Sequence, residues 1–290
     1  MMHYSMDIPK YYIAGDRGLV GTWYKKKYPD ALGGNTQNAN YMSRIDTNTD
    51  LQLYKPTHVI INAATVGGLQ EDLDKSFELM IKNLTIQNNI FEACRFNKTE
   101  RVLLQGSTCS YPAVGEQPYK ETQLMQGEPF ATYLPTALPK LMGMYQCRAS
   151  NEKYDTHWRT AINTNMFGPH DRTGEHAHVI GALMQKFVDA CMHNTNEIEI
   201  WGSGNQSRDI LYIEDAVDAY MQLSAALASD KSLRGEAFNF SNESQKTVLD
   251  LTQMILDSLG SKVEPVIQGN NQGEIINQCL SATKAKTLLN

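Results

Sequence analysis

The chain has 290 residues, a net charge of −6 and 41% hydrophobic residues, enough for one large α/β domain or a domain with a smaller cap. The absence of a basic block argues against a nucleic-acid partner, and no apolar run approaches the roughly 18 residues that would indicate a membrane span. The N-terminus lacks the apolar core of a secretory signal. Without a CxxC pair, the five cysteines favour a reduced, cytoplasmic protein.

Alternating apolar and polar segments predict strands that are each followed by a helix. Up to residue 170, the predicted segments are a strand and glycine turn in "YYIAGDRGLVG", a strand in "HVIINAAT", a helix over 73–97, a strand in "RVLLQGSTCSYP", a helix over 137–153 and a strand in "WRTAINTNMFGP". This alternation is typical of a doubly wound parallel sheet.

The pattern changes after about residue 170. Predicted helices over 178–192, 214–228 and 246–259 are separated by the short strands "EIEIWG", "DILYI" and "AFNFS". We therefore expect a first domain over 1–170 and a smaller, mainly substrate-binding domain over 171–290. A segment near 205–240 is expected to return to the first domain, because no linker separates the two parts.

A glycine motif follows the first strand. Gly15, Gly18 and Gly21 have the spacing G-x-x-G-x-x-G. The first glycine permits a tight turn, the second lets the backbone approach a pyrophosphate, and the third allows close packing of helix on strand. The motif predicts a Rossmann-type nucleotide-binding domain, with an ordinary glycine-rich turn as the alternative.

The cofactor prediction depends on the end of the second strand. An acidic residue there would hold the ribose hydroxyls of NAD. The segment "ALGGNTQNAN" over 31–40 is neutral and Arg44 follows it, which favours NADP, although NAD is not excluded. Asp46 could accept a hydrogen bond from the adenine amine, or could cap a short helix.

Polar residues follow another predicted strand. Ser107, Thr108 and Cys109 stand at its carboxyl end, where open α/β sheets bind ligands, and Lys140 lies on the next helix. A hydroxyl beside a carbonyl substrate and a lysine near a nicotinamide ribose form the constellation of a short-chain dehydrogenase/reductase. That constellation also has a tyrosine four residues before the lysine, whose phenol passes a proton as hydride moves.

Six stretches in one order carry a more specific resemblance. They are "IAGDRGLVG", "AATVGG", "GSTCSYP", "NTNMFGPHD", "HVIGAL" and "WGSGNQSRDILYIED". The chain resembles the GDP-L-fucose synthases, the GDP-4-keto-6-deoxymannose 3,5-epimerase/4-reductases of the extended short-chain dehydrogenase/reductase superfamily. The resemblance covers most of residues 11–240.

The resemblance implies a role for each matching position. Ser107 would polarise the sugar carbonyl, Cys109 and His178 would be the acid/base pair of epimerisation, and Lys140 would anchor the nicotinamide ribose. The implied cofactor contacts are Gly15, Gly18, Leu19, Val20, Gly21, Asp46, Ala63, Ala64, Lys140, Asn163, Asn165 and His178. The implied GDP-sugar contacts are Ser107, Thr108, Asn165, Val179, Leu183, Lys186, Trp201 and Arg208, with Lys186 in place of a family arginine at the diphosphate.

The acid/base pair suits the chemistry. A thiol of pKa about 8.5 and an imidazole of about 6.5 can exchange protons α to a ketone near neutral pH. Cys109 could instead be a small buried residue, His178 a capping or core histidine, and Trp201 plain core. A metal site at His170, Asp171, His176 and His178 is disfavoured, because their spacing fits no tight zinc template.

Thr136 occupies the position of the tyrosine in the stretch "TYLPTALPK". An aliphatic hydroxyl has a pKa far above the phenol's value of about 10, so Thr136 is a poor proton donor. Pro135 and Pro139 predict that the helix starts at or just before Thr136, which could then serve only as a cap. Tyr133 could reach the same pocket, although seven residues of helical rise separate it from Lys140 by about 10 Å.

These residues predict a cytoplasmic, NADP-dependent epimerase/reductase of a GDP- or other NDP-sugar, whose reduction step is slowed, rerouted or lost. The stretch "EIINQCLSATKAK" has Asn or Gln where the family has a basic residue at the substrate, so a related 4-keto sugar stays an alternative. A catalytically silent, cofactor-binding homologue is the non-enzyme alternative. By resemblance, a homodimer through helices near 76–96 and 137–153 is expected.

Overall fold

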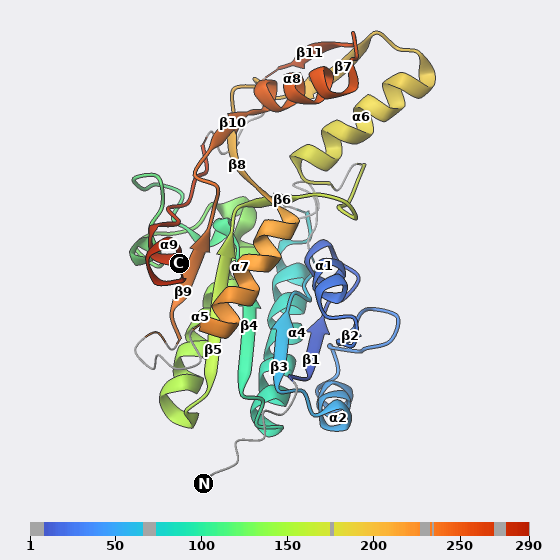
Figure 1. Ribbon diagram of the computed structural model, residues 1–290. Helices are drawn as coiled ribbons and strands as arrows, with labels where there is room; N and C mark the ends of the chain where they lie inside the picture. Colours follow the sequence, from blue (N-terminus) through green and yellow to red (C-terminus); the bar gives the residue numbers. More distant parts are fainter. Residues whose placement is uncertain are drawn as a thin grey trace.

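The computed structural model describes residues 9–65, 74–174, 177–226, 233, 235–269 and 277–289. Its larger lobe is built on a six-stranded sheet in which all neighbouring strands are parallel. The predicted doubly wound parallel sheet is therefore confirmed (Figure 1). The strand order is β2 (Leu32–Gly34), β1 (Tyr11–Ala14), β3 (His58–Ile61), β4 (Arg101–Gln105), β5 (His157–Asn163) and β9 (Ala237–Phe240).

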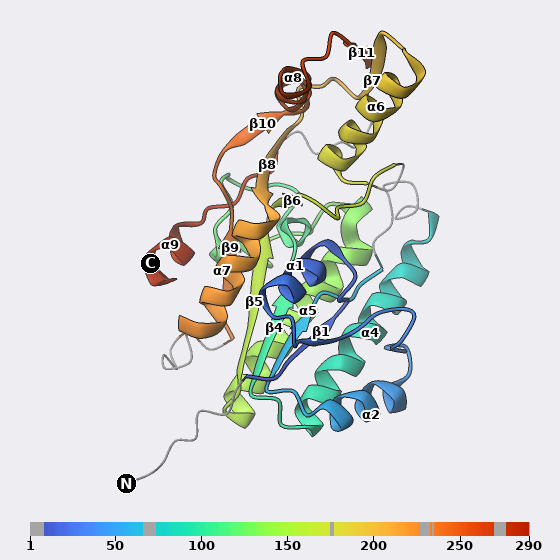
Figure 2. The same ribbon diagram turned by 45° about the vertical axis from the view of Figure 1, so that its right-hand side comes forward.

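Helices cover both faces of this sheet, as Figures 1 and 2 show. Alternate residues of a strand point to opposite faces, so Ile13 packs with Val20 and Tyr220 while Tyr12 and Ala14 join the core on the other side. The helices on the Ile13 side are α1 (Leu19–Lys27) and α7 (Ile213–Ala226), and those on the other side are α2 (Arg44–Tyr54), α4 (Ser76–Phe96) and α5 (Leu134–Tyr154).

The smaller lobe has its own apolar core. Phe187, Ile198, Ile200 and Leu256 are among its buried residues. The lobe consists of α6 (Val179–His193), β7 (Glu197–Trp201), α8 (Val248–Leu259) and β11 (Glu264–Gln268), in which β7 and β11 pair in parallel.

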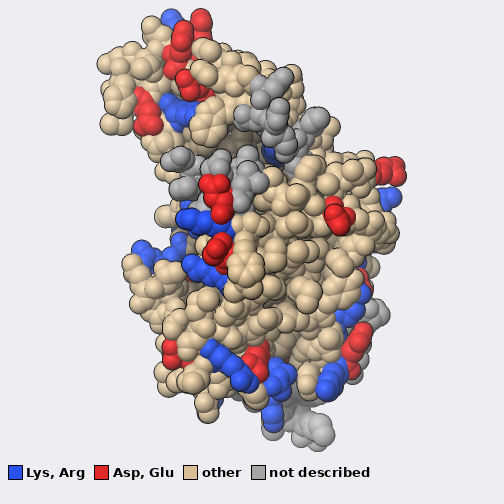
Figure 3. Space-filling view, turned by 180° about the vertical axis from the view of Figure 1, so that it is seen from behind, with Lys and Arg blue, Asp and Glu red and all other residues tan. Residues whose placement is uncertain are grey.

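A three-stranded sheet lies between the lobes, in the order β10 (Gln245–Thr247), β8 (Ser207–Tyr212), β6 (Asn165–Phe167). The chain passes along it several times: β8 leads back to α7 and β9 of the large sheet, and β10 leads out again to α8. The last helix, α9 (Thr283–Leu289), packs against β9. Seen from behind, the surface narrows between the two lobes, and basic and acidic side chains are interspersed over that face (Figure 3).

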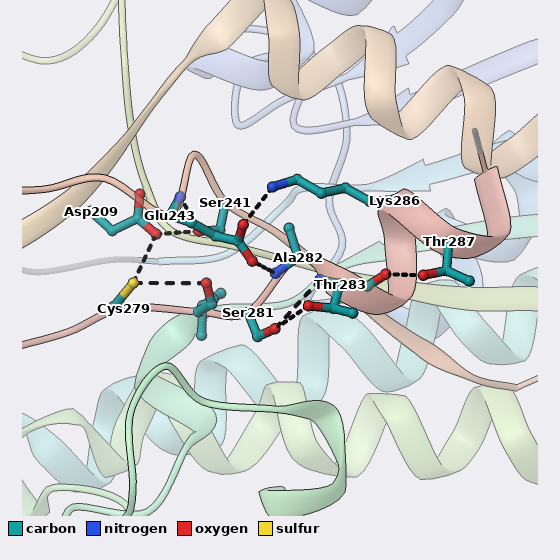
Figure 4. Close-up of polar contacts among 10 residues, drawn as sticks. Asp209, Ser241, Glu243, Cys279, Ser281, Ala282, Thr283, Lys286 and Thr287 are labelled. Atoms are coloured by element: carbon teal, nitrogen blue, oxygen red, sulfur yellow. Dashed lines mark hydrogen bonds and ion pairs between the residues drawn. The ribbon is translucent and has the colours of Figure 1, made fainter.

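Asp209 on β8 holds the end of the chain in place. It is fully buried, and burial raises the pKa of its carboxyl. Figure 4 shows its Oδ2 atom accepting from the hydroxyl of Ser241 and facing the Cys279 thiol, whose Sγ lies 3.7 Å away. Nearby, Lys286 of α9 pairs with Glu243. These contacts fix the C-terminal segment against the sheet between the lobes.

No helix within the described residues is long and apolar enough to cross a bilayer.

The alternative role of Asp46 as a helix cap is wrong. The helix that Asp46 could have capped begins earlier, at Arg44, and Ser43 is its N-cap, accepting from the backbone N–H of Asp46 at 3.2 Å. Asp46 therefore lies in the first turn of α2, where its charge favours the helix dipole.

Candidate active site

The glycine loop connects β1 to α1 at the carboxyl end of the sheet. Gly15 has φ +87°, and a Cβ atom on Gly21 would lie 2.3 Å from the Gly15 carbonyl oxygen, so only glycine allows this packing. Gly18 is the N-cap of α1, and no side chain caps the helix there. The first N–H groups of α1, beginning at half-buried Leu19 and buried Val20, are thus open to an anionic group.

The neighbouring strand ends carry unsatisfied polar atoms. Both amide atoms of Asn62, directly after β3, and Oδ1 of Asn163, the last residue of β5, are buried without a partner among the described residues. Ala63 and Ala64 follow Asn62 and are half-buried. The strand order reverses between β1 and β3, which is where such sheets bind dinucleotides. The glycine cradle and these orphaned amides fit a dinucleotide.

The loop after β2 lies where the adenosine end of a dinucleotide would bind in such a sheet. A recess of about 410 Å³ is lined there by residues 36–40, Asp46 and Asp50. Asp46 accepts a hydrogen bond from Asn40 Nδ2 at 3.0 Å. Arg44 turns to α4 and pairs with Glu92, with Nη2 2.6 Å from Oε1. Arg44 is therefore engaged away from the position where it would favour NADP.

The turn after β4 positions the candidate carbonyl-binding groups. Ser107 is the N-cap of a short 3₁₀ turn, η1 (Thr108–Ser110), and its Oγ accepts from the backbone N–H of Cys109 at 3.2 Å. Because Oγ is the acceptor in that bond, its own hydrogen can be donated to a substrate carbonyl. Thr108 is buried, and its hydroxyl donates to the Asn163 carbonyl at 3.3 Å, so it fixes the turn. Cys109 is half-buried.

Lys140 lies on α5, which packs against η1. Its side chain is buried, and loss of hydration lowers the pKa of its ammonium from 10.5 to about 8. Thr136 is half-buried one turn before it, so the two residues share a helix face. The helix begins at Leu134, just before Thr136 as expected, but it continues through Pro139. Thr136 is the third residue of α5, so the interpretation as a cap is wrong.

Tyr133 is the N-cap residue of α5 and ends the 3₁₀ turn η3 (Ala131–Tyr133). It lies half-buried before the helix, as expected for a residue out of register with Lys140. The hydroxyl of the adjacent Thr132 is buried without a partner among the described residues. The start of this helix therefore carries two further hydroxyl groups, those of Thr132 and Tyr133, beside that of Thr136.

His178 is the N-cap of α6 and is exposed, so it is not a core residue, and no side-chain bond caps the helix. Val179 begins the helix and is half-buried. Leu183 is 4% exposed and packs in the core of the smaller lobe. The substrate contact expected at Leu183 stays a prediction, for a side chain that packs mainly in the core of the smaller lobe.

The metal interpretation gains no support. Within the ranges that the structure describes, no three His, Cys, Asp or Glu side chains gather in a way that could hold an ion. His176 lies outside the described residues. Asp171 keeps one buried oxygen without a described partner, and burial raises the pKa of this carboxyl. His170 has φ +75° in the same loop.

The remaining predicted substrate contacts lie around the small lobe and β8. Lys186 donates to the Glu199 carbonyl at 2.6 Å and lies 4.4 Å from the ring centre of Trp201, which is 57% exposed and so is not plain core. Arg208 on β8 donates to the Ser207 carbonyl at 2.8 Å. Asn165 begins β6, with its amide 3.5 Å from the Asp209 carbonyl. In the stretch "EIINQCLSATKAK", where an Asn or Gln replaces the family's basic residue, Asn277 accepts from the Ser207 hydroxyl at 2.8 Å.

Sequence reasoning missed three polar residues. Asn62 could have been found, since it directly follows a buried strand. Asp16 lies inside the glycine motif, but the sequence of a loop does not show in which direction a side chain points. Asn83 carries no distinguishing signal, because it lies in the amphipathic helix α4 among the residues that this helix buries.

The fold and the site together define a Rossmann-type, dinucleotide-binding protein with a hydroxyl–thiol turn and a buried lysine at the carboxyl edge of the sheet. The model of the NAD dependent epimerase/dehydratase family matches residues 13–240, and the chain belongs to that family.

Individual relatives make the resemblance more specific. The chain is 27% identical over 294 residues to GDP-L-fucose synthase of Escherichia coli (strain K12), covering 98% of this chain and 91% of that protein. It is 28% identical over 215 residues to GDP-L-colitose synthase of Yersinia pseudotuberculosis, covering 72% and 70%. A GDP-D-glycero-L-gluco-heptose synthase from Campylobacter jejuni, solved in the presence of NADPH, has the same fold, with a TM-score of 0.85, 21% identity and coverage of 97% and 92%. The resemblance to the GDP-L-fucose synthases is thereby confirmed.

Proposed function

We propose that this chain is an NADP(H)-dependent epimerase/reductase of a GDP-4-keto-6-deoxyhexose. The observation that carries the proposal is the turn holding Ser107 and Cys109 at the carboxyl end of β4, packed against the helix with buried Lys140. The curated relatives named for GDP-L-fucose and GDP-L-colitose synthesis support the GDP-sugar, and the relative solved with NADPH supports the cofactor.

Epimerisation requires proton exchange beside the ketone. Ser107 donates its hydroxyl hydrogen to the C4 carbonyl oxygen, which stabilises the negative charge that develops there. One member of the Cys109–His178 pair removes the proton α to the carbonyl, and the other returns a proton to the opposite face. The thiol and the imidazole come from different parts of the chain, the turn after β4 and the N-terminus of α6.

Reduction requires a proton donor for the C4 oxygen. The dinucleotide, when bound, supplies hydride to C4 of the sugar. Lys140 holds the nicotinamide ribose, and its pKa of about 8 leaves the ammonium largely charged at neutral pH. Thr136 has the place of the phenol but ionises far less readily, so it transfers a proton poorly. We therefore propose that proton exchange is intact while reduction is slow.

The direct test uses purified protein and a GDP-4-keto-6-deoxyhexose. We expect deuterium from the buffer to enter C3 and C5 without a hydride donor, and NADPH to be oxidised slowly. A protein that binds the dinucleotide but neither exchanges nor reduces any 4-keto sugar would instead be a catalytically silent homologue. Deuterium exchange with another NDP-sugar only would support the proposed reaction but show that the proposed substrate is wrong.

We also propose that the protein is a homodimer formed through α4 and α5. These helices pack side by side and expose large apolar side chains, including Phe77 (72% exposed), Ile81, Met142 and Tyr145. Sedimentation should show a dimer, and Phe77→Lys should weaken it, whereas a monomeric wild type would contradict the proposal.

We further propose that the protein acts in the cytoplasm. All five cysteines are free thiols, which is the state that a reducing compartment maintains.

A further inference from the structure

Asp16 brings a carboxylate to the tip of β2 from the glycine loop. It directly follows Gly15, and its side chain is only 6% exposed. Its Oδ1 atom accepts a hydrogen bond from Asn35 Nδ2 at 2.8 Å, and Asn35 is the first residue after β2. This is the place where dinucleotide-binding sheets put the acidic residue that contacts the adenosine ribose. The carboxylate that is missing from residues 31–40 is thus supplied by another part of the chain.

The surroundings fix this carboxylate. The backbone N–H groups of Gly15 and Asp16 both donate to the Gly34 carbonyl, at 2.7 and 3.3 Å. A Cβ atom on Gly33 would lie 2.4 Å from the Asp16 Cβ, so the glycine leaves room for the Asp16 side chain. Lys25 on α1 places its Nζ 3.2 Å from Asp16 Oδ2 while its own side chain is 43% exposed. The acid is held below the surface, and its counter-charge faces solvent.

We propose that Asp16 is a cofactor-selectivity residue, which accepts a hydrogen bond from the adenosine ribose of NADH and opposes the 2′-phosphate of NADPH. Lys25 neutralises part of this charge, so NADPH still binds, with a smaller preference over NADH. Asp46 and Asp50, which line the adjacent recess, act in the same direction as Asp16. The inference rests on the proposed function, because it requires a dinucleotide at the glycine loop.

The test is a pair of fluorescence titrations, with NADPH and with NADH, on four proteins. Asp16→Asn keeps the shape of the side chain and an acceptor for Asn35, and should raise the preference for NADPH over NADH by about tenfold. Lys25→Gln removes the counter-charge and should lower that preference by a similar factor. Asp30→Asn is the matched control, because Asp30 is an exposed acid before β2, at the opposite end of that strand. It should leave the preference unchanged.

The ratio of the two dissociation constants separates selectivity from a structural role, which would weaken both dinucleotides alike. An unchanged ratio in Asp16→Asn and Lys25→Gln, with both dinucleotides still bound, overturns the inference and leaves the proposed function standing. If the wild type binds neither dinucleotide, the proposed function fails and the inference fails with it. Opposite shifts of the ratio in the two variants support the inference.

Discussion

The side-chain amide of Asn83 donates a hydrogen bond to the Pro135 carbonyl oxygen, with Nδ2 3.3 Å from that oxygen. In a regular helix this oxygen would accept from the N–H of residue 139, which is proline and has none. Asn83 also binds both backbone polar groups of Thr65, accepting from its N–H at 2.7 Å and donating to its carbonyl at 2.9 Å. One amide therefore joins the loop after β3 to the start of the helix that carries Thr136.

We predict that Asn83→Ala lowers the free energy of unfolding by about 1–3 kcal/mol, because it leaves buried backbone groups unsatisfied. Urea unfolding of the wild type and the variant measures this. The matched background is Pro139→Ala, which restores the helical donor to Pro135. There, Asn83→Ala should be milder by about 1 kcal/mol. The same loss in both backgrounds would show that the Pro135 contact adds nothing.

Lys140, which we propose to hold the nicotinamide ribose, should destabilise the folded protein. Its folded-state pKa of about 8 lies below its ordinary value of 10.5, so the unfolded chain binds more protons between these values. Stability therefore rises with pH through this window, and the penalty is fully present at pH 7. Lys140→Met should raise the free energy of unfolding at pH 7 by up to about 3 kcal/mol.

Urea unfolding at neutral and alkaline pH checks this prediction. Lys153→Met is the control, because Lys153 is exposed on the same helix. It should change stability little. A Lys140→Met protein less stable than the Lys153→Met protein at pH 7 would contradict the assignment of a desolvated ammonium.

His58, at the amino end of β3, should make the folded protein sensitive to acid. Burial, with a smaller effect of Arg101, lowers the pKa of its imidazole from 6.5 to about 4. Between these values the unfolded chain binds more protons, so stability is lost as pH falls from 6.5 towards 4. At pH 5 the loss should be about 2 kcal/mol.

Unfolding of His58→Gln at pH 7.5 and pH 5 isolates this effect. The variant should lose less stability than the wild type between the two values. His193→Gln, at an exposed residue on α6, should keep the wild-type pH dependence. An equal pH dependence in all three proteins would show that another group is responsible.

The large sheet could be predicted because its strands carry local signals. "HVII" is apolar throughout, and the glycine motif marks the turn after β1. The side-chain partners could not be predicted in the same way, since they come from distant residues. Arg44 pairs with Glu92, 48 positions away, and the helix tolerates Pro139 because Asn83, on another helix, satisfies the Pro135 carbonyl. The burial of Leu183 could not be predicted either, since an apolar residue near a site and one in the core have the same sequence pattern.

The proposed acid/base pair of Cys109 and His178 gives the first kinetic prediction. With a 4-keto-6-deoxy sugar in deuterated buffer, Cys109→Ser and His178→Ala should each slow deuterium entry at C3 or C5 by at least about 10²-fold, the usual effect of losing an acid/base group. Mass spectrometry of the recovered sugar measures it. Unchanged exchange in both variants would assign these residues to structure rather than to catalysis.

A second kinetic prediction concerns Tyr133, whose phenol is the other candidate proton donor for reduction. Tyr133→Phe should leave NADPH oxidation near the wild-type rate if the phenol at the start of α5 does not reach the sugar. Loss of most of the reductase activity would instead make Tyr133 the proton donor. In that case the residue at position 136 would not limit the rate of reduction.

The decisive measurement is the rate of NADPH oxidation with a GDP-4-keto-6-deoxyhexose, compared between the wild type and Thr136→Tyr, with deuterium exchange followed in parallel. A phenol one turn before Lys140 should raise the oxidation rate by about 10²–10⁴-fold, less what Pro139 loses through misplacement, while exchange stays near the wild-type rate. A wild type that reduces the sugar briskly and gains nothing from Thr136→Tyr would contradict the claim that this site exchanges protons readily but lacks its reducing acid.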